Sequence, residues 1–332
     1  MKKVVVTGGA GFIGSHLVDR LLKEKRRVVA IDNLSNGALK NLERARSHPL
    51  FSFYRADVSN RERIRPLFRG ADTVFHLAAL ADIVPSVQRP ADYFRANVDG
   101  TLSVMECARH AGVRQVLYAA SSSCYGIPDR YPTPEGAGIR PQYPYALTKF
   151  LGEQIVLHWG QVYKIKANSL RFFNVYGPRA RTNGTYGAVF KVFLPQKIHG
   201  MPFTIVGDGR QTRDFTYVAD VVEAFSAVAN SELKNQVMNV GSGKTVSVNT
   251  IIRLLGGGKT VRLPKRPGEP DRTFADISKI KKLTGWKPRV SIENGIRMLL
   301  KHLDDFQDLP VWTPDKIEKA TQDWFYYLEE RG

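Results

Sequence analysis

The sequence of 332 residues predicts an α/β fold, in which a doubly wound parallel sheet is followed by a smaller mixed α/β domain. Short apolar strands alternate with helical patterns through the first half, an order typical of parallel sheets flanked by helices. A glycine-rich turn joins the first strand to the first helix. After Tyr176 the pattern becomes irregular and is interrupted by Gly and Pro, so we place the two domains at residues 1–175 and 176–332.

The apolar runs define the expected elements in chain order. Strands are expected at Lys3–Val6, Arg27–Ile31, Phe51–Arg55, Thr73–Leu77, Gln115–Ala119 and Lys166–Phe172. Helices are expected near Gly11–Lys23, Pro90–Ala111 and Pro144–Tyr163, the last with proline at a favoured first helical position. A further helix near Tyr217–Asn230 belongs to a segment, about 213–240, that we expect to pack back onto the first domain.

The chain is strongly basic, with 49 Lys and Arg against 31 Asp and Glu and a net charge of +18. Such a balance favours polyanionic partners, which include nucleic acid, anionic membranes and phosphorylated metabolites. A hydrophobic fraction of 43% excludes a disordered chain. Composition does not choose among the three kinds of partner.

Cysteine usage and the N-terminus predict the compartment. Cys107 and Cys124 provide neither a disulfide framework nor a Cys-x-x-Cys motif, and the seven His lack ligand spacing, so no metal site is expected. The first apolar run ends at Gly8 after four residues, which is too short for a signal peptide. No stretch approaches the ~20 apolar residues of a membrane span. We therefore expect a cytoplasmic protein with no membrane partner.

A phosphate-binding turn is predicted directly after the first strand. Gly8, Gly11 and Gly14 lie where the backbone must turn tightly, approach a pyrophosphate and pack a helix against a strand. The first helix then offers free N–H groups to the anion. Asp32 follows at the end of the second strand, where its carboxylate can accept hydrogen bonds from a ribose and would repel a 2′-phosphate. The order of strand, turn, helix, strand and acid predicts NAD rather than NADP, with Asp57 as a weaker adenine candidate or a turn cap.

A second constellation predicts acid–base chemistry. Tyr145 and Lys149 are four residues apart on one face of an expected helix. Ser121 ends the preceding strand, at the sheet edge where ligands bind in such folds. A nearby ammonium and an oxidised nicotinamide would lower the pKa of Tyr145, so that its phenolate takes a proton from a sugar hydroxyl as a hydride goes to NAD. Ser121 would hydrogen-bond that oxygen, and Lys149 would also hold the nicotinamide ribose.

Seven motifs together carry a family resemblance: TGGAGFIGSH, DNLSNG, HLAA, SSSCYG, YPYALTK, RFFNVYGPR and VGDGRQTRDF. With them the chain resembles the extended short-chain dehydrogenase/reductase family, with its Rossmann-type sheet, and within it the nucleotide-sugar epimerases of the UDP-glucose 4-epimerase type. The match runs from Met1 to about Pro288. The piece from about Asp304 carries no motif.

The resemblance implies a role for each matching position. The catalytic set would be Ser121, Tyr145 and Lys149. The NAD contacts would be Gly8, Gly11, Phe12, Ile13, Gly14, Asp32, Asn33, Asp57, Val58, Leu77, Ala78, Ala79, Asn97, Tyr145 and Lys149. The contacts to a nucleotide-diphosphate sugar would be Ser122, Ser123, Asn174, Thr204, Arg213, Arg266 and Glu269, with a base-reading loop near Thr204–Ile205. It also implies a homodimer packed through the helices near Asn97–Ala111 and Tyr145–Val162.

Departures from related patterns narrow the expected reaction. Related 4,6-dehydratases carry Asp-Glu where this chain has Ser122 and Ser123, so the acid that water elimination requires is missing. Related glucuronate epimerases place an Arg near Val84, where no cation stands here. The usual Arg-Pro-Gly-Asp ends in Glu269, and the small Thr273 suggests room for an N-acetylated sugar.

These features favour an NAD-dependent nucleotide-sugar 4-epimerase of the UDP-glucose/galactose type, acting through a transient 4-keto sugar. The alternatives are a 4,6-dehydratase or an epimerase on another nucleotide sugar, among them UDP-glucuronate. A non-catalytic nucleic-acid-binding member of the fold is a remote alternative, because no RNA-binding motif accompanies the charge. Cys124 and the four Trp are interpreted as packed core or interface residues.

Overall fold

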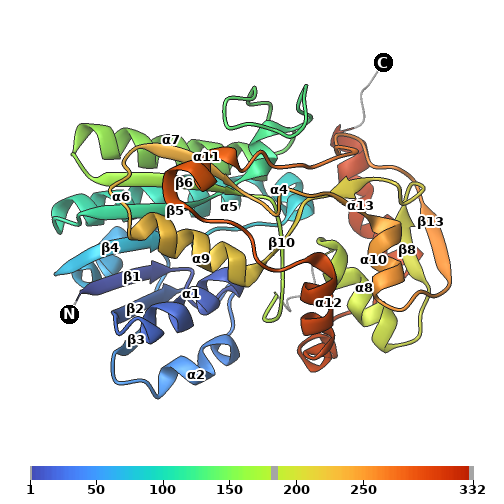
Figure 1. The fold of residues 1–332 in the computed structure, drawn as a ribbon, viewed down its shortest axis with the longest axis horizontal. Coiled ribbons are helices and arrows are strands. Elements are labelled where there is room, and N and C mark those ends of the chain that lie inside the picture. Colours follow the sequence, from blue (N-terminus) through green and yellow to red (C-terminus); the bar gives the residue numbers. More distant parts are fainter. Residues whose placement is uncertain (1, 181–185, 329–332) are drawn as a thin grey trace.

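The computed structural model describes residues 2–180 and 186–328. Within them, seven parallel strands form one sheet in the order β11-β6-β5-β4-β1-β2-β3 (Figure 1). These strands are β1 (Lys3–Thr7), β2 (Arg27–Asp32), β3 (Phe51–Arg55), β4 (Ala71–His76), β5 (Gln115–Ser121), β6 (Lys166–Phe172) and β11 (Gln236–Val240). The α/β fold and its doubly wound parallel sheet are confirmed.

Helices cover both faces of the sheet, and the strand periodicity shows why. Val4 and Val6 of β1 pack in the core that contains residues of α1 (Phe12–Lys23) and α9 (Val218–Ala229). Val5 points to the opposite face, whose core contains residues of α6 (Gly100–His110) and α7 (Pro144–Val162). Successive side chains of a strand alternate between the two faces, so a buried parallel sheet needs apolar residues throughout.

The expected elements agree with the observed ones to within a few residues, with one informative difference. The helix expected near Pro90–Ala111 consists of α5 (Pro90–Phe94), a π-helical turn (Arg95–Asp99) and α6. The π turn carries Asn97, and such turns occur often at functional sites. The segment near 213–240 does reach the sheet, because α9 packs against α1 and β11 pairs with β6.

Short elements complete this part of the chain. They are the 3₁₀ turns Leu39–Leu42, Arg65–Phe68 and Ser122–Tyr125, and the helices α2 (Glu43–Arg46), α3 (Arg61–Ile64) and α4 (Ile83–Gln88). The carboxyl ends of β1, β4 and β5 lie at one edge of the sheet, since all three strands run parallel. The turns that follow them therefore meet at that edge.

A smaller body lies beside this edge (Figure 1). Its helices are α8 (Val189–Ile198), α10 (Val248–Leu254), α12 (Ile292–Leu300) and α13 (Pro314–Leu328), with a 3₁₀ turn at Leu303–Phe306. A further helix, α11 (Ser278–Thr284), packs its Ile280 into the core of the large sheet instead. Its strands pair as β7 (Asn174–Tyr176) with β10 (Phe215–Tyr217), β8 (Phe203–Val206) with β13 (Thr260–Leu263), and β9 (Thr212–Arg213) with β12 (Val246–Ser247). Helix α11 contacts β11 of the large sheet.

The prediction of a loop near Thr204–Ile205 is wrong, because both residues lie in β8 and Ile205 is buried in the core of the smaller body.

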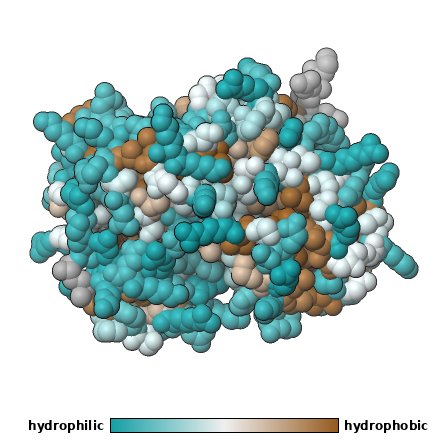
Figure 2. Space-filling view, viewed as in Figure 1, coloured by the Kyte–Doolittle hydropathy of each residue, from teal (hydrophilic) through white to brown (hydrophobic). Residues whose placement is uncertain are grey.

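Figure 2 shows a mostly hydrophilic face whose largest group of hydrophobic residues lies over the smaller body. Among the described residues, no helix combines the length and the apolar character that crossing a membrane requires.

Candidate active site

The glycine-rich turn forms a cradle between β1 and α1. Gly8 has a φ of +70°, and a Cβ there would lie 2.7 Å from the backbone nitrogen of Ala78. A Cβ on Gly14 would overlap the carbonyl oxygen of Gly8. Gly11 is the N-cap of α1 and provides no side-chain cap, so the first N–H groups of the helix, at Phe12 and Ile13, stay available to an anion. The cradle therefore fits the pyrophosphate of a dinucleotide.

Asp32 lies beside this cradle at the end of β2. Its Oδ2 accepts the N–H of Ala10 at 3.0 Å and its Oδ1 accepts the N–H of Leu34 at 2.8 Å. Burial raises the pKa of Asp32, and these backbone hydrogen bonds oppose the rise. The N–H of Gly11 also bonds to this carboxylate, so one of its four acceptor positions stays open to a ribose hydroxyl. The residue present therefore fits the adenosine end of NAD.

Asn33 and Asp57 are brought together by neighbouring strand ends. The amide of Asn33 donates to Oδ2 of Asp57 at 3.1 Å. The other oxygen of Asp57 accepts the backbone N–H of Ser59 at 2.8 Å. Asp57 is thus a turn cap, the alternative role considered for it. Its other oxygen, Oδ2, bonds to Asn33. Val58 follows Asp57 and is buried.

A buried hydrogen-bond chain fixes the segment after β4, which contains Leu77, Ala78 and Ala79. Nδ1 of His76 lies 2.7 Å from Oγ1 of Thr7, and Nε2 lies 2.9 Å from Oγ1 of Thr101. Thr101 donates its own proton to the carbonyl of Asn97 at 2.6 Å, so it accepts from Nε2 of His76. Nδ1 then accepts from Thr7, which receives the N–H of Ala78 at 3.3 Å. Burial lowers the pKa of His76 to about 3 and keeps the ring neutral, as this chain requires.

Asn97 joins this segment to the helix that carries Tyr145. Its Oδ1 accepts the N–H of Leu80 at 2.8 Å, and its amide donates to the carbonyl of Leu80 and to the hydroxyl of Thr148. Asn97 is 1% exposed. Three of its four hydrogen-bonding positions are used within the protein, which leaves one lone pair for a cofactor.

Ser121 and Tyr145, from β5 and α7, are in contact. A side-chain hydrogen bond with Ser121 lowers the pKa of Tyr145, whereas burial, the larger effect, raises it. Oγ of Ser121 also lies 2.7 Å from Oγ of Ser123, and it accepts the N–H of Ser123 as the cap of the following turn. Ser122 is the first residue of that turn. The strand end therefore presents the hydroxyl of Ser121 to Tyr145, while that of Ser123 bonds to the neighbouring Tyr143.

Lys149 is 4% exposed, and its ammonium lies over the ring of Tyr118, 4.2 Å from the centroid. Burial lowers the pKa of Lys149 to about 7, while Glu153 raises it. The expected lowering of the Tyr145 pKa by this ammonium is therefore not seen, because burial dominates and raises the pKa of Tyr145. The physical reason is that a buried phenolate loses more hydration than one neighbouring hydroxyl returns.

The face of α7 that carries Tyr145 and Lys149 is anchored one turn further on. Glu153, 1% exposed, forms an ion pair with Arg171 of β6 at 2.6 Å and accepts a hydrogen bond from Ser169 at 2.7 Å. Arg171 also donates to the hydroxyl of Tyr125 at 2.9 Å. This network ties the helix to the sheet. The sequence showed Glu153 four residues after Lys149, but its partner became visible only in the fold.

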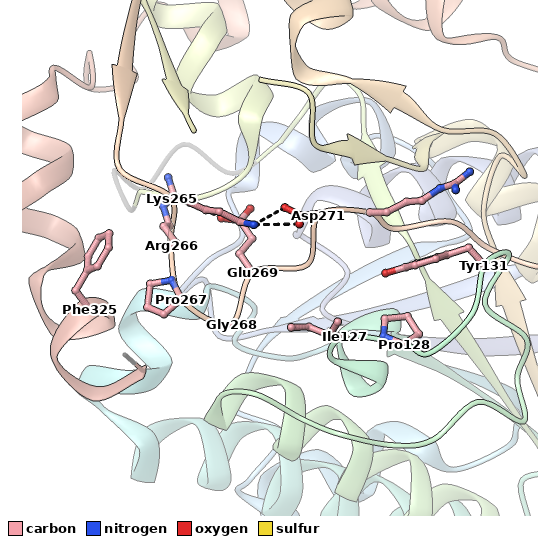
Figure 3. Close-up of a pocket in the computed structure, with 11 residues that line it drawn as sticks. Ile127, Pro128, Tyr131, Lys265, Arg266, Pro267, Gly268, Glu269, Asp271 and Phe325 are labelled. Carbon is pink, nitrogen blue, oxygen red and sulfur yellow. Dashed lines mark hydrogen bonds and ion pairs between the residues drawn. The ribbon is translucent and has the colours of Figure 1, made fainter. Parts of the chain in front are cut away.

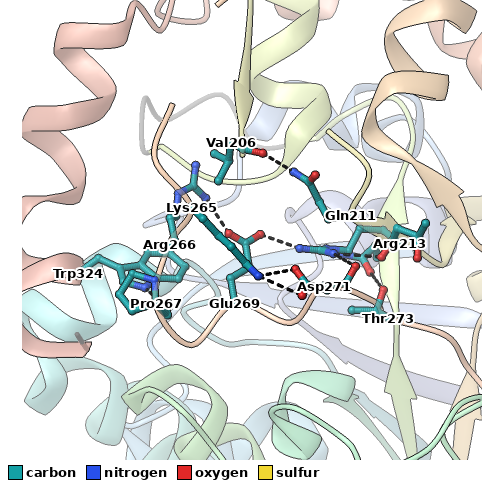
Figure 4. A network of polar contacts seen from close by, with 12 residues as sticks. Val206, Gln211, Arg213, Lys265, Arg266, Pro267, Glu269, Asp271, Thr273 and Trp324 are labelled. Carbon is teal, nitrogen blue, oxygen red and sulfur yellow. Dashed lines mark hydrogen bonds and ion pairs between the residues drawn. The ribbon is translucent and has the colours of Figure 1, made fainter. Parts of the chain in front are cut away.

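The candidate phosphate-binding side chains meet in the smaller body (Figure 4). Nη2 of Arg213 donates to Oε1 of Glu269 at 2.8 Å. Nη1 of Arg266 lies 3.5 Å from Oε2 of Glu269, an oxygen that is buried and accepts no hydrogen bond among the described residues. Burial lowers the pKa of Arg266. Two guanidinium groups around one carboxylate leave a net positive site, suited to a diphosphate.

Asn174, Thr273 and Thr204 lie in the same body. The hydroxyl of Thr273 donates to Oδ1 of Asn174 at 2.7 Å and accepts the N–H of Asp214 at 3.1 Å. Thr204 is buried, and its hydroxyl accepts from the amide of Gln196 at 2.9 Å. The side chain of Thr204 is thus engaged within the protein.

A pocket of about 590 Å³ opens beside this cluster (Figure 3). One side is formed by the Arg266–Glu269 turn and the other by Ile127, Pro128 and Tyr131, which follow the serine row. Phe325 of α13 also lines the pocket, as do Lys265, Asp271 and Arg272. The sequence carried no signal for Phe325, because nothing local places the C-terminal helix at this mouth.

Two further residues came together only in the fold. Nζ of Lys191, on α8, lies 3.8 Å from Oδ1 of Asp82 at the start of α4. The carbonyl of Asp82 accepts the hydroxyl of Tyr93 at 2.6 Å, and the ring of Tyr93 stands edge-on to that of Tyr145, with centroids 6.4 Å apart. A cation thus stands beside Asp82, two residues before Val84, although Val84 itself is a buried apolar residue.

The remaining candidate groups are inert or scattered. Cys124 is 2% exposed and burial raises the pKa of its thiol to about 12, which fits a packed residue. Within residues 2–180 and 186–328, no group of three or more His, Cys, Asp and Glu is placed to hold a metal ion.

Comparison with known proteins agrees with this geometry. The UDP-glucose 4-epimerase of Mycolicibacterium smegmatis is 36% identical over 301 residues, which cover 89% of this chain and 96% of that protein. The crystal structure of a mutant UDP-glucuronic acid 4-epimerase from Bacillus cereus, in complex with a fluorinated UDP-glucuronic acid and NAD, is 32% identical with a TM-score of 0.85, over 91% of this chain and 99% of that one.

The UDP-N-acetylglucosamine 4-epimerase of Methanobrevibacter ruminantium, in complex with UDP-N-acetylmuramic acid, is 34% identical with a TM-score of 0.86, over 91% of this chain and 98% of that one. Residues 4–241 match the model of a family whose description names NAD. The predicted cofactor and the predicted family resemblance are thereby confirmed. The chain belongs to the NAD dependent epimerase/dehydratase family.

Proposed function

We propose that this protein is a nucleotide-sugar 4-epimerase that acts on a UDP-hexose. The observation that carries the proposal is the contact of Tyr145 with Ser121, one helical turn from the buried Lys149, at the sheet edge that also holds the glycine cradle. A tyrosine, a hydroxyl and a lysine in this order can move the proton of a secondary alcohol. The likeness to 4-epimerases of three UDP-sugars supports the substrate class.

In this proposal the two ligands are held by separate groups. Gly8, Gly11 and Gly14 with the start of α1 hold the pyrophosphate of NAD, and Asp32 holds its adenosine ribose. The other proposed NAD contacts follow the carboxyl ends of β2, β3 and β4 or lie on the helices beside them. Arg213 and Arg266 bind the diphosphate of the sugar nucleotide, where their guanidinium groups can grip phosphate oxygens.

The protein's own groups then manage one proton. Ser121 donates a hydrogen bond to the C4 oxygen, and Tyr145 takes the proton of that hydroxyl and later returns it. Lys149, with a pKa lowered to about 7, exchanges its own proton close to neutral pH and so can restore the charge state of the tyrosine. Bound NAD supplies a reversible hydride acceptor and a positive ring that favours the phenolate. The 4-keto sugar turns over, and reduction on its other face completes the inversion.

Epimerisation is preferred over 4,6-dehydration for a structural reason. Elimination of water needs a proton donor and acceptor for C5 and C6 beside the C4 oxygen. Ser122 and Ser123 occupy the turn after Ser121, and their hydroxyls are poor acids and bases. The arrangement therefore supports inversion at C4 alone.

Turnover of a panel of UDP-sugars tests the proposal. Purified protein is incubated with UDP-glucose, UDP-N-acetylglucosamine and UDP-glucuronate, and the products are separated by chromatography. Inversion at C4 is expected, and Tyr145→Phe should lower the rate by roughly 10²- to 10⁴-fold while NAD stays bound. Tyr163→Phe, an exposed position beyond the end of the same helix, is the matched control. Loss of water, or no inversion with any sugar, would reject the proposal.

An acidic sugar is a second candidate, and a specific observation favours it. Lys191 stands 3.8 Å from the carboxylate of Asp82, whose backbone carbonyl bonds to Tyr93, the ring neighbour of Tyr145. We propose that its ammonium accepts the carboxylate of a glucuronate. Lys191→Met is then expected to lower turnover of UDP-glucuronate at least tenfold more than that of UDP-glucose. Equal effects on the two sugars would exclude this role.

We also propose the division of labour and the assembly. Residues 1–175 with the returning segment bind NAD, and residues 176–332 bind the sugar nucleotide. Leu102 on α6 and Leu147 and Val162 on α7 are 37%, 38% and 51% exposed, which supports pairing of these helices with a second copy. Light scattering should give twice the mass of one chain, and Leu102→Glu should reduce it to one.

A further inference from the structure

The indole of Trp324 links α13 to the loop that carries Arg266. Trp324 is 3% exposed, and its Nε1–H donates to the carbonyl oxygen of Pro267 at 2.8 Å (Figure 4). Pro267 lies between Arg266 and Glu269, and Glu269 in turn contacts both Arg266 and Arg213 in the candidate phosphate-binding cluster. A side chain from the last described helix thus fixes the backbone of a loop more than fifty residues earlier.

The same indole also contacts the Arg266 side chain. The guanidinium carbon of Arg266 lies 5.4 Å from a Trp324 ring centroid and 4.7 Å from that of Tyr186. Nη2 of Arg266 also donates a hydrogen bond to the hydroxyl of Tyr186. Aromatic faces attract a guanidinium and fix its plane. Two aromatic rings therefore restrict the orientation of Arg266, whose fork must match the oxygens of a diphosphate.

Helix α13 is itself held in place by α4, a helix that also packs against α7, which carries the candidate catalytic residues. The amide of Gln88, at the end of α4, donates to Oδ2 of Asp323 at 2.8 Å, and α13 packs against α4. The ring of Trp324 lies 6.2 Å from that of Tyr143, which is parallel to the ring of Tyr145 with centroids 6.4 Å apart. Trp324 therefore lies between the Arg266 loop and the residues next to the candidate base.

We propose that Trp324 is a positioning residue for the diphosphate of the substrate, through its hydrogen bond to Pro267 and its stacking on Arg266. This inference rests on the proposed function, because it assumes that Arg266 binds a nucleoside diphosphate. Holding the loop and the guanidinium in their binding arrangement before the ligand arrives lowers the ordering cost of binding. A Trp324 that served only as core of the smaller body would affect stability and leave the affinity for the ligand unchanged.

Binding of UDP to the full chain loaded with NAD tests this role by calorimetry. Trp324→Ala should weaken UDP binding roughly 10- to 30-fold, since it removes both the hydrogen bond and the stacking. Trp324→Phe keeps an aromatic ring and loses the N–H donor, so it should weaken binding roughly 3- to 10-fold. The KM for the sugar nucleotide should rise in parallel with smaller changes in kcat, and NAD retention should not change. Tyr327→Ala, 62% exposed on the same helix, is the control and should bind UDP as wild type does.

The outcomes separate this inference from the function on which it rests. If wild type binds UDP and both Trp324 variants bind it within threefold of wild type, the positioning role is overturned and the proposed function stands. If Trp324→Ala does not fold, Trp324→Phe decides alone: weakening of threefold or more supports the role, and a smaller change overturns it. Failure of wild type to bind UDP would overturn both.

Discussion

Lys149 makes the sharpest link between the site and the stability of the fold. Its side chain is 4% exposed, and burial lowers its pKa from 10.5 to about 7. Replacing it with methionine keeps the length of the side chain and removes the ammonium. Lys149→Met should therefore lose activity and gain stability. Active-site residues often destabilise the folded state, so replacing one can raise stability while it lowers activity.

The size of the gain follows from the pKa difference. One pKa unit corresponds to about 1.4 kcal/mol, so carrying the charge into the folded protein costs at most about 5 kcal/mol. Below pH 7 both the folded and the unfolded chain hold the proton, and the full cost applies. Between pH 7 and 10.5 the unfolded chain binds the proton and the folded chain does not, so the cost falls with rising pH, to about 2 kcal/mol at pH 9.

These free energies translate into a measurable melting shift. An unfolding entropy of about 2.1 cal/mol/K per residue gives ~0.7 kcal/mol/K for 332 residues, or about 1.4 °C per kcal/mol. The Tm of Lys149→Met should exceed that of wild type by up to about 7 °C at pH 6 and by about 3 °C at pH 9. Differential scanning calorimetry at both pH values measures this. A variant less stable than wild type at pH 6, or a difference that does not shrink by pH 9, would refute the reasoning.

Three further predictions concern the cofactor cradle and the support of α7. Gly14→Ala should purify without NAD, measured by absorbance of the acid extract, because the new Cβ overlaps the carbonyl of Gly8; full NAD content would contradict the cradle. Asp32→Ser should shift the NADP-to-NAD affinity ratio at least tenfold toward NADP, measured by fluorescence titration, since it removes the charge that repels a 2′-phosphate. Glu153→Gln leaves Arg171 buried without its counter-charge and should lower stability by about 3–5 kcal/mol; an unchanged denaturation midpoint would count against that pair.

Local rules account for the features that the sequence predicted well. The positions of β1, α1 and β2 follow from apolar runs and from glycines that a tight turn requires, all within one stretch of chain. The four-residue spacing of Tyr145 and Lys149 places them on one face of any helix, whatever surrounds it. The prediction of a loop near Thr204–Ile205 was wrong because these residues form β8, whose pairing partner, β13, lies more than fifty residues away in the sequence.

Long-range packing accounts for what the sequence could not show. The pKa of Tyr145 depends on how deeply the folded protein buries it, and no spacing reports that. Lys191 reaches Asp82 from a different element, more than a hundred residues along the chain. The residues around Val84 in the sequence therefore gave no sign of this cation. The structure explains only part of the high net charge. It places Arg213 and Arg266 around Glu269, at a candidate site for a phosphorylated ligand.

The amino-acid order was sufficient to predict the class of fold, the glycine-rich turn and the candidate reacting side chains, because short-range geometry and residue chemistry dictate each of them. The boundaries of the candidate sugar-nucleotide pocket required the three-dimensional arrangement. Trp324 and Phe325 carry no local signature of binding. Because α13 packs against α4, Phe325 lines the pocket and Trp324 bonds to the Arg266 loop beside it. Packing between distant segments is a property of the whole chain, and it places a motif-free helix beside the candidate phosphate-binding arginine.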